Sequence, residues 1–280
     1  MPGTNRRIIG CNVIDPLLAV KGGLEYNIEI TERSLEFLKE IGHDATEFSH
    51  GCHWTPDECE QVRATAERVG IEPWSLHTWA AGDVMTDEGA AEVTEGLTIA
   101  FRNALALATG RIIYHPSGNK LDAPDDQARL EREAELIAGV WQPGVRIALE
   151  NMQTLGSMEY LIGVVDALGE ERAGVCVDTG HAALGDLGAG RAIRMAGDRL
   201  ITTHIQDNLG ERDDHMPPWD GTIDWDDVIA ALAEVRYPGC VQLELTDQPS
   251  DPARRPVIKE ELKRGQAAAK RIADALPWPV

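Results

Sequence analysis

Residues 146–178 read RIALENMQTLGSMEYLIGVVDALGEERAGVCVD. One apolar run ends in Glu150 and another in Asp178, and between them Ser157–Leu168 has the length and composition of a helix. A strand, a helix and a second strand in this order make up the repeating unit of a parallel sheet, in which the helix crosses one face. The segment therefore predicts one such unit, with an acidic side chain at the end of each strand.

The same alternation of short apolar runs and longer amphipathic stretches extends over the whole chain. The runs expected to form strands are Arg7–Val13, Ala45–Ser49, Glu72–His77, Arg111–His115, Arg146–Asn151, Gly174–Asp178, Leu200–Gln206 and Cys240–Leu245. The expected helices are Thr31–Ile41, one beginning at Pro56 after a Thr55 cap, Asp87–Ala108, Asp125–Val140, Ser157–Leu168, a short one within Leu184–Gly197, Asp226–Val235 and Pro252–Leu276. Eight strand–helix pairs fit a closed barrel better than an open sheet, and no GxGxxG motif follows the first strand. We expect an α/β fold, a single (β/α)₈ TIM barrel domain over residues 1–280.

Composition narrows the class of protein. The chain has 47 acidic and 26 basic residues, a net charge of −21, which argues against a nucleic-acid partner because such proteins carry basic surfaces. No apolar stretch reaches the roughly 18 residues of a membrane span. Asp15 and Pro16 interrupt the N-terminal apolar run and no signal-peptide cleavage site follows, so we expect a cytoplasmic protein. The five cysteines form no CxxC pair and are expected to be core residues.

Four expected strands end in a side chain that is able to bind a metal ion. These side chains are Glu150, Asp178, His204 and Glu244. Active sites of barrels lie at the carboxyl ends of the strands, so the four are expected to meet at one side of the mouth. A buried carboxylate needs a cation or a hydrogen-bond network. Three carboxylates and one imidazole suit Mn²⁺, Mg²⁺, Co²⁺ or Zn²⁺, and the alternative is a buried ion-pair network.

Most histidines are expected to lie at the same end of the barrel as these four side chains. Only His43 precedes an expected strand; the others end a strand or lie just beyond one, namely His50, His53, His77, His115, His181, His204 and His215. At these residues the sequence resembles the xylose isomerase-like barrel superfamily, which contains sugar isomerases and epimerases, inosose dehydratases and endonuclease IV. The resemblance covers essentially the whole chain and rests on Ser75-Leu76-His77, Tyr114-His115-Pro116, Leu149-Glu150-Asn151, Asp178-Thr179-Gly180-His181, His204-Ile205-Gln206-Asp207, Asp213-Asp214-His215 and Leu243-Glu244.

The resemblance implies a divalent-metal-dependent sugar isomerase or epimerase. One ion, Mn²⁺ as first choice with Zn²⁺, Co²⁺ or Mg²⁺ as alternatives, is expected on Glu150, Asp178, His204 and Glu244. Glu150 and Glu244 are then the acid/base pair that moves a proton through a metal-stabilised enediolate. The expected substrate is a small sugar, keto-sugar or cyclitol, and the chain is a candidate homo-oligomer.

Further residues are expected to bind the substrate. His181 and Arg212 resemble residues that hold substrate oxygen atoms, and His77 and His115 are assigned to substrate as well. Trp79 is placed to stack against a sugar ring, as are Trp54 and Trp219, for each of which packing under a loop is the alternative.

Other functions stay open at this stage. A dehydratase of the inosose or 3-dehydroshikimate type, a lyase, would use the same metal and the same enolate. His77, His115, Asp213 and His215 fall where endonuclease IV binds additional zinc, so a phosphodiesterase, or a second metal at Asp213 and His215, is a further alternative. A non-catalytic partner subunit is another. The relatives often carry a carboxylate where this chain has Gly156, which argues against a simple ketohexose as substrate.

Two polar residues beside the expected ligands are assigned supporting roles. Asn151 is expected to support the Glu150 carboxylate. Asp207 is expected to orient His204 or Arg212, with a solvated loop acid as the alternative.

Overall fold

The computed structural model describes residues 7–12, 26–49, 51–117, 127–245 and 255–277. Its strands are β1 (Ile9–Asn12), β2 (Ala45–Phe48), β3 (Glu72–His77), β4 (Arg111–Tyr114), β5 (Arg146–Glu150), β6 (Ala173–Asp178), β7 (Leu200–His204) and β8 (Val241–Leu243). Its α-helices are α1 (Ile28–Ile41), α2 (Pro56–Val69), α3 (Asp87–Leu107), α4 (Gln127–Val140), α5 (Leu155–Leu168), α6 (Thr179–Ala183), α7 (Ala189–Ala196), α8 (Trp225–Glu234) and α9 (Arg255–Ala275). Two 3₁₀ turns lie at Gly51–His53 and Gly197–Arg199.

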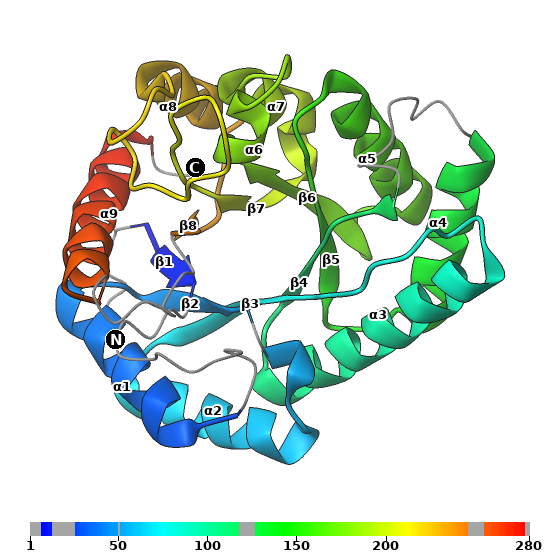
Figure 1. Cartoon of the computed structure of the whole chain (residues 1–280), viewed down its shortest axis with the longest axis horizontal. Helices are drawn as coiled ribbons and strands as arrows, with labels where there is room; N and C mark the ends of the chain where they lie inside the picture. Colours follow the sequence, from blue (N-terminus) through cyan, green and yellow to red (C-terminus); the bar gives the residue numbers. More distant parts are fainter. Residues whose placement is uncertain (1–6, 13–25, 50, 118–126, 246–254, 278–280) are drawn as a thin grey trace.

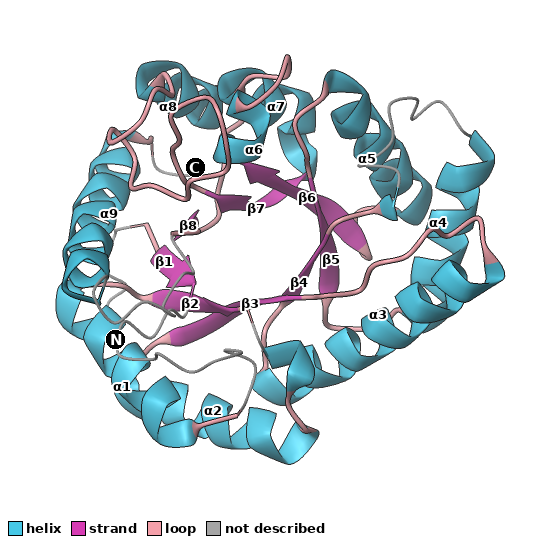
Figure 2. Ribbon diagram, viewed as in Figure 1, coloured by secondary structure: helices cyan, strands magenta, loops and turns pink. Residues whose placement is uncertain are grey.

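The strands form a parallel sheet that curls into a barrel. The strand order is β7-β6-β5-β4-β3-β2-β1-β8. The ends of this sheet meet where the Ile205 backbone N–H donates to the Gln242 carbonyl at 2.9 Å and Ile205 pairs with Leu243. The helices surround the strands on the outside (Figures 1 and 2). The predicted single (β/α)₈ TIM barrel is confirmed, whereas the domain limits of 1–280 stay a prediction.

Alternation along the strands divides the core into an outer and an inner part. Ile147 and Leu149 of β5 belong to the large core shared with the helices. Ala148, between them, belongs to a small separate cluster with Ile113 and Cys176 of the neighbouring strands. Since successive side chains of a strand point to opposite sides, this small cluster lies inside the barrel. Arg146 and Glu150 therefore face the interior too, below and above Ala148.

The observed elements agree closely with the predicted ones except after β6. A single helix is expected within Leu184–Gly197, but the structure has α6 as well as α7, and α6 begins directly at Thr179. The cause is Asp178, whose side chain accepts a hydrogen bond from the His181 backbone N–H at 2.6 Å and so caps the helix. Val13 and the first residues of two predicted helices lie outside the described residues.

A buried carboxylate fixes the long connection between β7 and α8. Asp207 is fully buried and accepts hydrogen bonds from the backbone N–H groups of Asn208 (2.8 Å), Trp219 (3.1 Å) and Ile223 (3.1 Å) and from Nε1 of Trp225 (2.8 Å). It thereby closes the loop on itself, so the prediction that it orients His204 or Arg212 is wrong. No helix in the described ranges is both long enough and apolar enough to cross a membrane.

Replacing Asp207 by alanine tests this anchor. We expect Asp207→Ala to lower the free energy of unfolding by about 3 kcal/mol or more, because each buried donor left without an acceptor costs about 1–3 kcal/mol. The matched control is Asp220→Ala in the same loop, since Asp220 is exposed and pairs with Arg264 at 2.8 Å. Its expected cost is below about 1 kcal/mol. Urea denaturation measures both, and equal, small effects would contradict the anchoring role.

Candidate functional site

Four strand ends bring their polar side chains together at one mouth of the barrel. Glu150, Asp178 and His204 are the last residues of β5, β6 and β7, and Glu244 follows β8. One ligand atom from each of the four lies within 4.8 Å of the others. Glu150, Asp178 and His204 are fully buried, whereas the Glu244 side chain is 13% exposed. The four predicted ligands are therefore neighbours in space, and Glu244 is the one nearest to solvent.

The two nitrogen atoms of His204 face carboxylates on opposite sides. Nδ1 lies 3.1 Å from Glu150 Oε1 and 3.1 Å from Glu244 Oε2. It is buried and makes no hydrogen bond among the described residues. Burial lowers the pKa of His204, but the surrounding carboxylates outweigh burial and raise the pKa well above its usual range. A cation, either a proton or a metal ion, is therefore required between Nδ1 and the carboxylates.

The second ring nitrogen of His204 identifies a residue that the sequence interpretation missed. Nε2 lies 3.1 Å from Oε2 of Glu47, and Ser75 Oγ donates to the same oxygen at 2.6 Å. A carboxylate that accepts the outer N–H of a metal-binding histidine fixes its tautomer and its ring orientation. Glu47 belongs to β2 and is fully buried. The signal in the sequence is an ionisable residue in the middle of a short buried strand.

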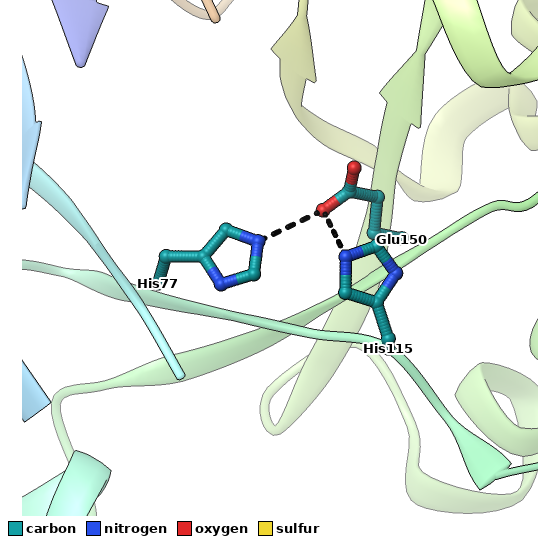
Figure 3. A group of neighbouring side chains, drawn as sticks. All are labelled: His77, His115 and Glu150. Atoms are coloured by element: carbon teal, nitrogen blue, oxygen red, sulfur yellow. Dashed lines mark ion pairs between the residues drawn. The ribbon is translucent and has the colours of Figure 1, made fainter. Parts of the chain in front are cut away.

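Glu150 is the most heavily contacted carboxylate of the cluster. Its Oε2 lies 3.4 Å from Nε2 of both His77 and His115, whose ring centroids are 5.3 Å apart (Figure 3). Its Oε1 lies 3.4 Å from His181 Nδ1 in addition to its contact with His204. Burial alone would raise the pKa of Glu150, yet the imidazoles hold it well below the usual range. Glu150 is thus ionised at neutral pH.

His77 and His115 share one carboxylate oxygen but differ in protonation. Burial lowers the pKa of His77, but hydrogen bonding and the charge of Glu150 raise it to about 9. Burial lowers the pKa of His115 to about 4, and the charge of Glu150 does not offset it. Protonated His77 therefore compensates the negative charge of Glu150 on this side, while His115 stays neutral. With Glu150 the two histidines also form a second group of three potential metal ligands.

The Asn151 side chain holds Asp178 through hydrogen bonds to the Asp178 backbone. Burial raises the pKa of the Asp178 carboxyl to about 7. The Asn151 side chain accepts a hydrogen bond from the Asp178 backbone N–H at 2.9 Å and donates to the Asp178 carbonyl at 3.1 Å. Asn151 therefore positions Asp178 at the end of β6, and the predicted support of the Glu150 carboxylate is not what its side chain provides.

The remaining predicted site residues lie at the rim. Asp213 joins two histidines, since its Oδ2 lies 3.1 Å from His181 Nε2 and 2.8 Å from His215 Nε2. In the described chain, Asp213 and His215 belong to none of the groups whose ligand atoms lie within 4.8 Å. The Arg212 side chain is 82% exposed and pairs with Asp214 at 3.0 Å. A second metal at Asp213 and His215 and a substrate contact at Arg212 stay predictions.

A cavity of about 450 Å³ opens beside the group of Glu150, Asp178, His204 and Glu244, which is called the carboxylate cluster below. Among its lining residues are His77, His115 and Trp79, three of the predicted substrate contacts. Trp79 is 56% exposed and its Nε1 donates to the Ser49 carbonyl at 2.9 Å, which holds the indole in place. Trp54 packs on Phe48, and Trp219 packs on Trp225, whereas stacking of either indole on a sugar ring stays a prediction.

With this geometry established, comparison with known proteins identifies the family. A family model described as a xylose isomerase-like TIM barrel matches residues 35–268. The chain belongs to the xylose isomerase-like TIM barrel family. This agrees with the resemblance carried by the strand-end motifs.

Among individual proteins, the chain is 32% identical to D-psicose 3-epimerase of Enterocloster bolteae over an alignment of 234 residues, with a coverage of 76% of each protein. It is 30% identical to an uncharacterized protein of Sinorhizobium fredii over 188 residues. That match covers 61% of this chain and 57% of the relative. A solved structure of an L-ribulose 3-epimerase superposes with a TM-score of 0.75 at 18% identity, over 95% of this chain and 94% of the other. At that identity the superposition shows the fold alone.

Glu47 gives a direct test of the candidate metal centre in this xylose isomerase-like barrel. We expect Glu47→Gln to weaken Mn²⁺ binding by about 10–100-fold, because loss of the carboxylate that fixes a histidine ligand typically has this effect. Isothermal titration calorimetry on the full chain measures the affinity. The control is Glu40→Gln, an exposed position on α1, with unchanged affinity. Wild-type affinity in Glu47→Gln would contradict the role assigned to Glu47.

Proposed function

We propose that the protein is a divalent-metal-dependent sugar isomerase or epimerase in which Glu150 and Glu244 move protons. The observation that carries the proposal is the placement of these two carboxylates, each 3.1 Å from the same nitrogen of His204. The name of a relative that is 32% identical, D-psicose 3-epimerase, supports this class of reaction.

The positions of Glu150 and Glu244 suit a reaction that removes a proton from one face of a carbon and returns one to the other. They come from the ends of β5 and β8, which are not neighbours in the sheet. A substrate lying over His204 would have one carboxylate on each side. Glu150 is ionised and fully buried, so it is suited to remove a proton, and Glu244 reaches solvent and is suited to exchange one.

The group Glu150, Asp178, His204 and Glu244 fits a divalent cation because it offers three carboxylates and an imidazole whose free nitrogen faces two of them. A cation held there supplies positive charge against the negative charge that develops on substrate oxygen atoms. Glu47 contacts the imidazole, Ser75 donates a hydrogen bond to Glu47, and Asn151 holds Asp178. The protein thus fixes the ligands before substrate arrives.

The cavity beside the cluster supports a small polyhydroxylated substrate. Trp79 offers an exposed indole face next to His77 and His115, and sugar rings stack on aromatic faces while their hydroxyl groups bond to polar neighbours. Relatives often carry a carboxylate at the position of Gly156, and glycine has no side chain that could make this polar contact. We therefore propose a ketose, keto-sugar or cyclitol other than a simple ketohexose.

Solvent deuterium exchange tests the reaction. The Mn²⁺-loaded protein is incubated in D₂O with a panel of ketoses, keto-sugars and inososes, and mass spectrometry follows the products. We expect one deuterium to be gained without loss of water. Glu150→Gln and Glu244→Gln should each slow this exchange by at least about 10²-fold, the usual contribution of a positioned acid or base.

The control for this assay is Glu92→Gln, an exposed position on α3, which should exchange at the wild-type rate. Full activity in Glu150→Gln or Glu244→Gln would contradict the acid/base assignment. Release of one water molecule per substrate would replace the isomerase assignment with a dehydratase.

A further inference from the structure

A second cavity, of about 620 Å³, lies at the opposite end of the barrel from the carboxylate cluster. It opens at the starts of β4, β5 and β7 and beside the connection from α8 to β8. Its lining includes Trp74, Arg111, Arg146, Leu200, Arg236 and Tyr237. The concentration of arginine is notable in a chain whose net charge is −21.

Two of these arginines lie side by side. Arg111 and Arg146 are the first residues of β4 and β5 and are paired directly in the sheet register. Each comes two residues before a member of the inner cluster, Ile113 and Ala148, so both point into the barrel. Like charges directly opposite on neighbouring strands destabilise a sheet unless an opposite charge compensates them.

In the described part of the chain neither guanidinium forms an ion pair with a carboxylate, although the charge of Glu72 acts on Arg111 and that of Glu170 acts on Arg146. Arg111 stacks on Trp74, with Cζ 3.6 Å from the ring centroid, and Nη1 donates to the Trp74 carbonyl at 3.4 Å. Arg146 Nη2 donates to the Ala173 carbonyl at 2.9 Å, and its Nε is buried without a described hydrogen-bond partner. Most of their donors are left for another acceptor.

The acidic residues near the cavity do not form ion pairs with Arg111 or Arg146 among the described residues. Glu234 lines the cavity, but Arg194 holds its carboxylate with two contacts of 2.6 and 3.2 Å. Asp198 lines it as well and is exposed. Glu72 acts on Arg111 electrostatically, and burial still lowers the pKa of Arg111 overall. A guanidinium remains charged at neutral pH all the same, so the pair keeps two positive charges.

We propose that this second cavity, at the floor of the barrel where the strands begin, binds a small phosphate-bearing anion through Arg111 and Arg146. Paired guanidinium groups present parallel N–H donors that match the oxygen atoms of phosphate. The volume lies within the range of small-molecule sites, about 300–1,000 Å³, and exceeds the need of phosphate alone. Apolar lining residues such as Leu200, Ile201 and Val235 suit the organic part of a phosphate monoester.

This site is separate from the proposed active site. Arg146 and Glu150 are four residues apart on β5, which at about 3.3 Å per residue places their backbones roughly 13 Å apart. The inner cluster of Ile113, Ala148 and Cys176 lies between them. Binding at the floor therefore does not require the metal or the sugar substrate, and its test does not depend on enzymatic activity.

The test follows the arginine Nε–H resonances of the ¹⁵N-labelled full chain by NMR, with EDTA present. The probes are inorganic phosphate and glycerol 3-phosphate, and sodium chloride at matched ionic strength is the control. Arg111→Lys and Arg146→Lys assign the two resonances. We expect saturable shifts of both with either probe, and none with chloride.

Variants then test the contribution of the pair. Arg111→Met/Arg146→Met should weaken phosphate binding by about tenfold or more, since the variant removes both guanidinium groups that would donate charge-assisted hydrogen bonds to the anion. Arg264→Met, which removes an exposed arginine paired with Asp220, should bind like the wild type. If the double variant does not fold, the shifts in the wild-type protein decide alone.

Tighter binding of the ester than of inorganic phosphate would support an organic occupant, and equal affinity would assign the cavity to free phosphate. Absence of a saturable shift at Arg111 and Arg146 in the millimolar range would overturn the proposal. So would binding that the double variant leaves unchanged.

Discussion

The carboxylate of Glu150 is surrounded by imidazoles, and the rest of the site depends on this arrangement. Nitrogen atoms of His77, His115, His181 and His204 all lie within 3.4 Å of its two oxygens. A buried carboxylate needs compensating positive charge or a set of hydrogen bonds. Around Glu150 the imidazoles supply positive charge when they are protonated, and they hold the pKa of its carboxyl well below the usual range. A metal ion provides positive charge equally well and would displace protons on binding, because a histidine binds metal through a deprotonated nitrogen.

The alternation of side chains along each strand explains how a charged cluster with a large desolvation cost is held inside the barrel. On β5, Arg146, Ala148 and Glu150 face the barrel interior in three successive layers, while Ile147 and Leu149 face the helices. The outer residues provide the hydrophobic stabilisation, which leaves the inner positions at each end open to charged side chains. The same geometry places the carboxylates at one mouth and the arginine pair at the other. One pattern of alternation therefore creates both proposed sites.

Much of this could be predicted from the sequence, because a polar residue that directly follows a buried run marks the carboxyl end of a strand. Glu150, Asp178, His204 and Glu244 were found in this way. Glu47 was missed because it stands within its strand, and the inward side of a four-residue strand is not evident from its sequence.

Hydrogen bonds between distant residues were also beyond the sequence. Asp207 looked like a partner of His204 because the two are close in the chain. Its real partners are the backbone of its own loop and the indole of Trp225, which only the folded loop brings near. Arg111 and Arg146 are 35 positions apart and become neighbours only through the register of β4 and β5.

The proposed divalent-metal site on Glu150, Asp178, His204 and Glu244 can be tested with crystals grown with Mn²⁺ and measured at a wavelength where manganese scatters anomalously. We expect a strong anomalous peak within coordination distance of all four side chains, on the Nδ1 side of His204. A map with no peak there, while the protein is fully loaded in solution or binds Mn²⁺ elsewhere, would show that these residues do not form a metal site.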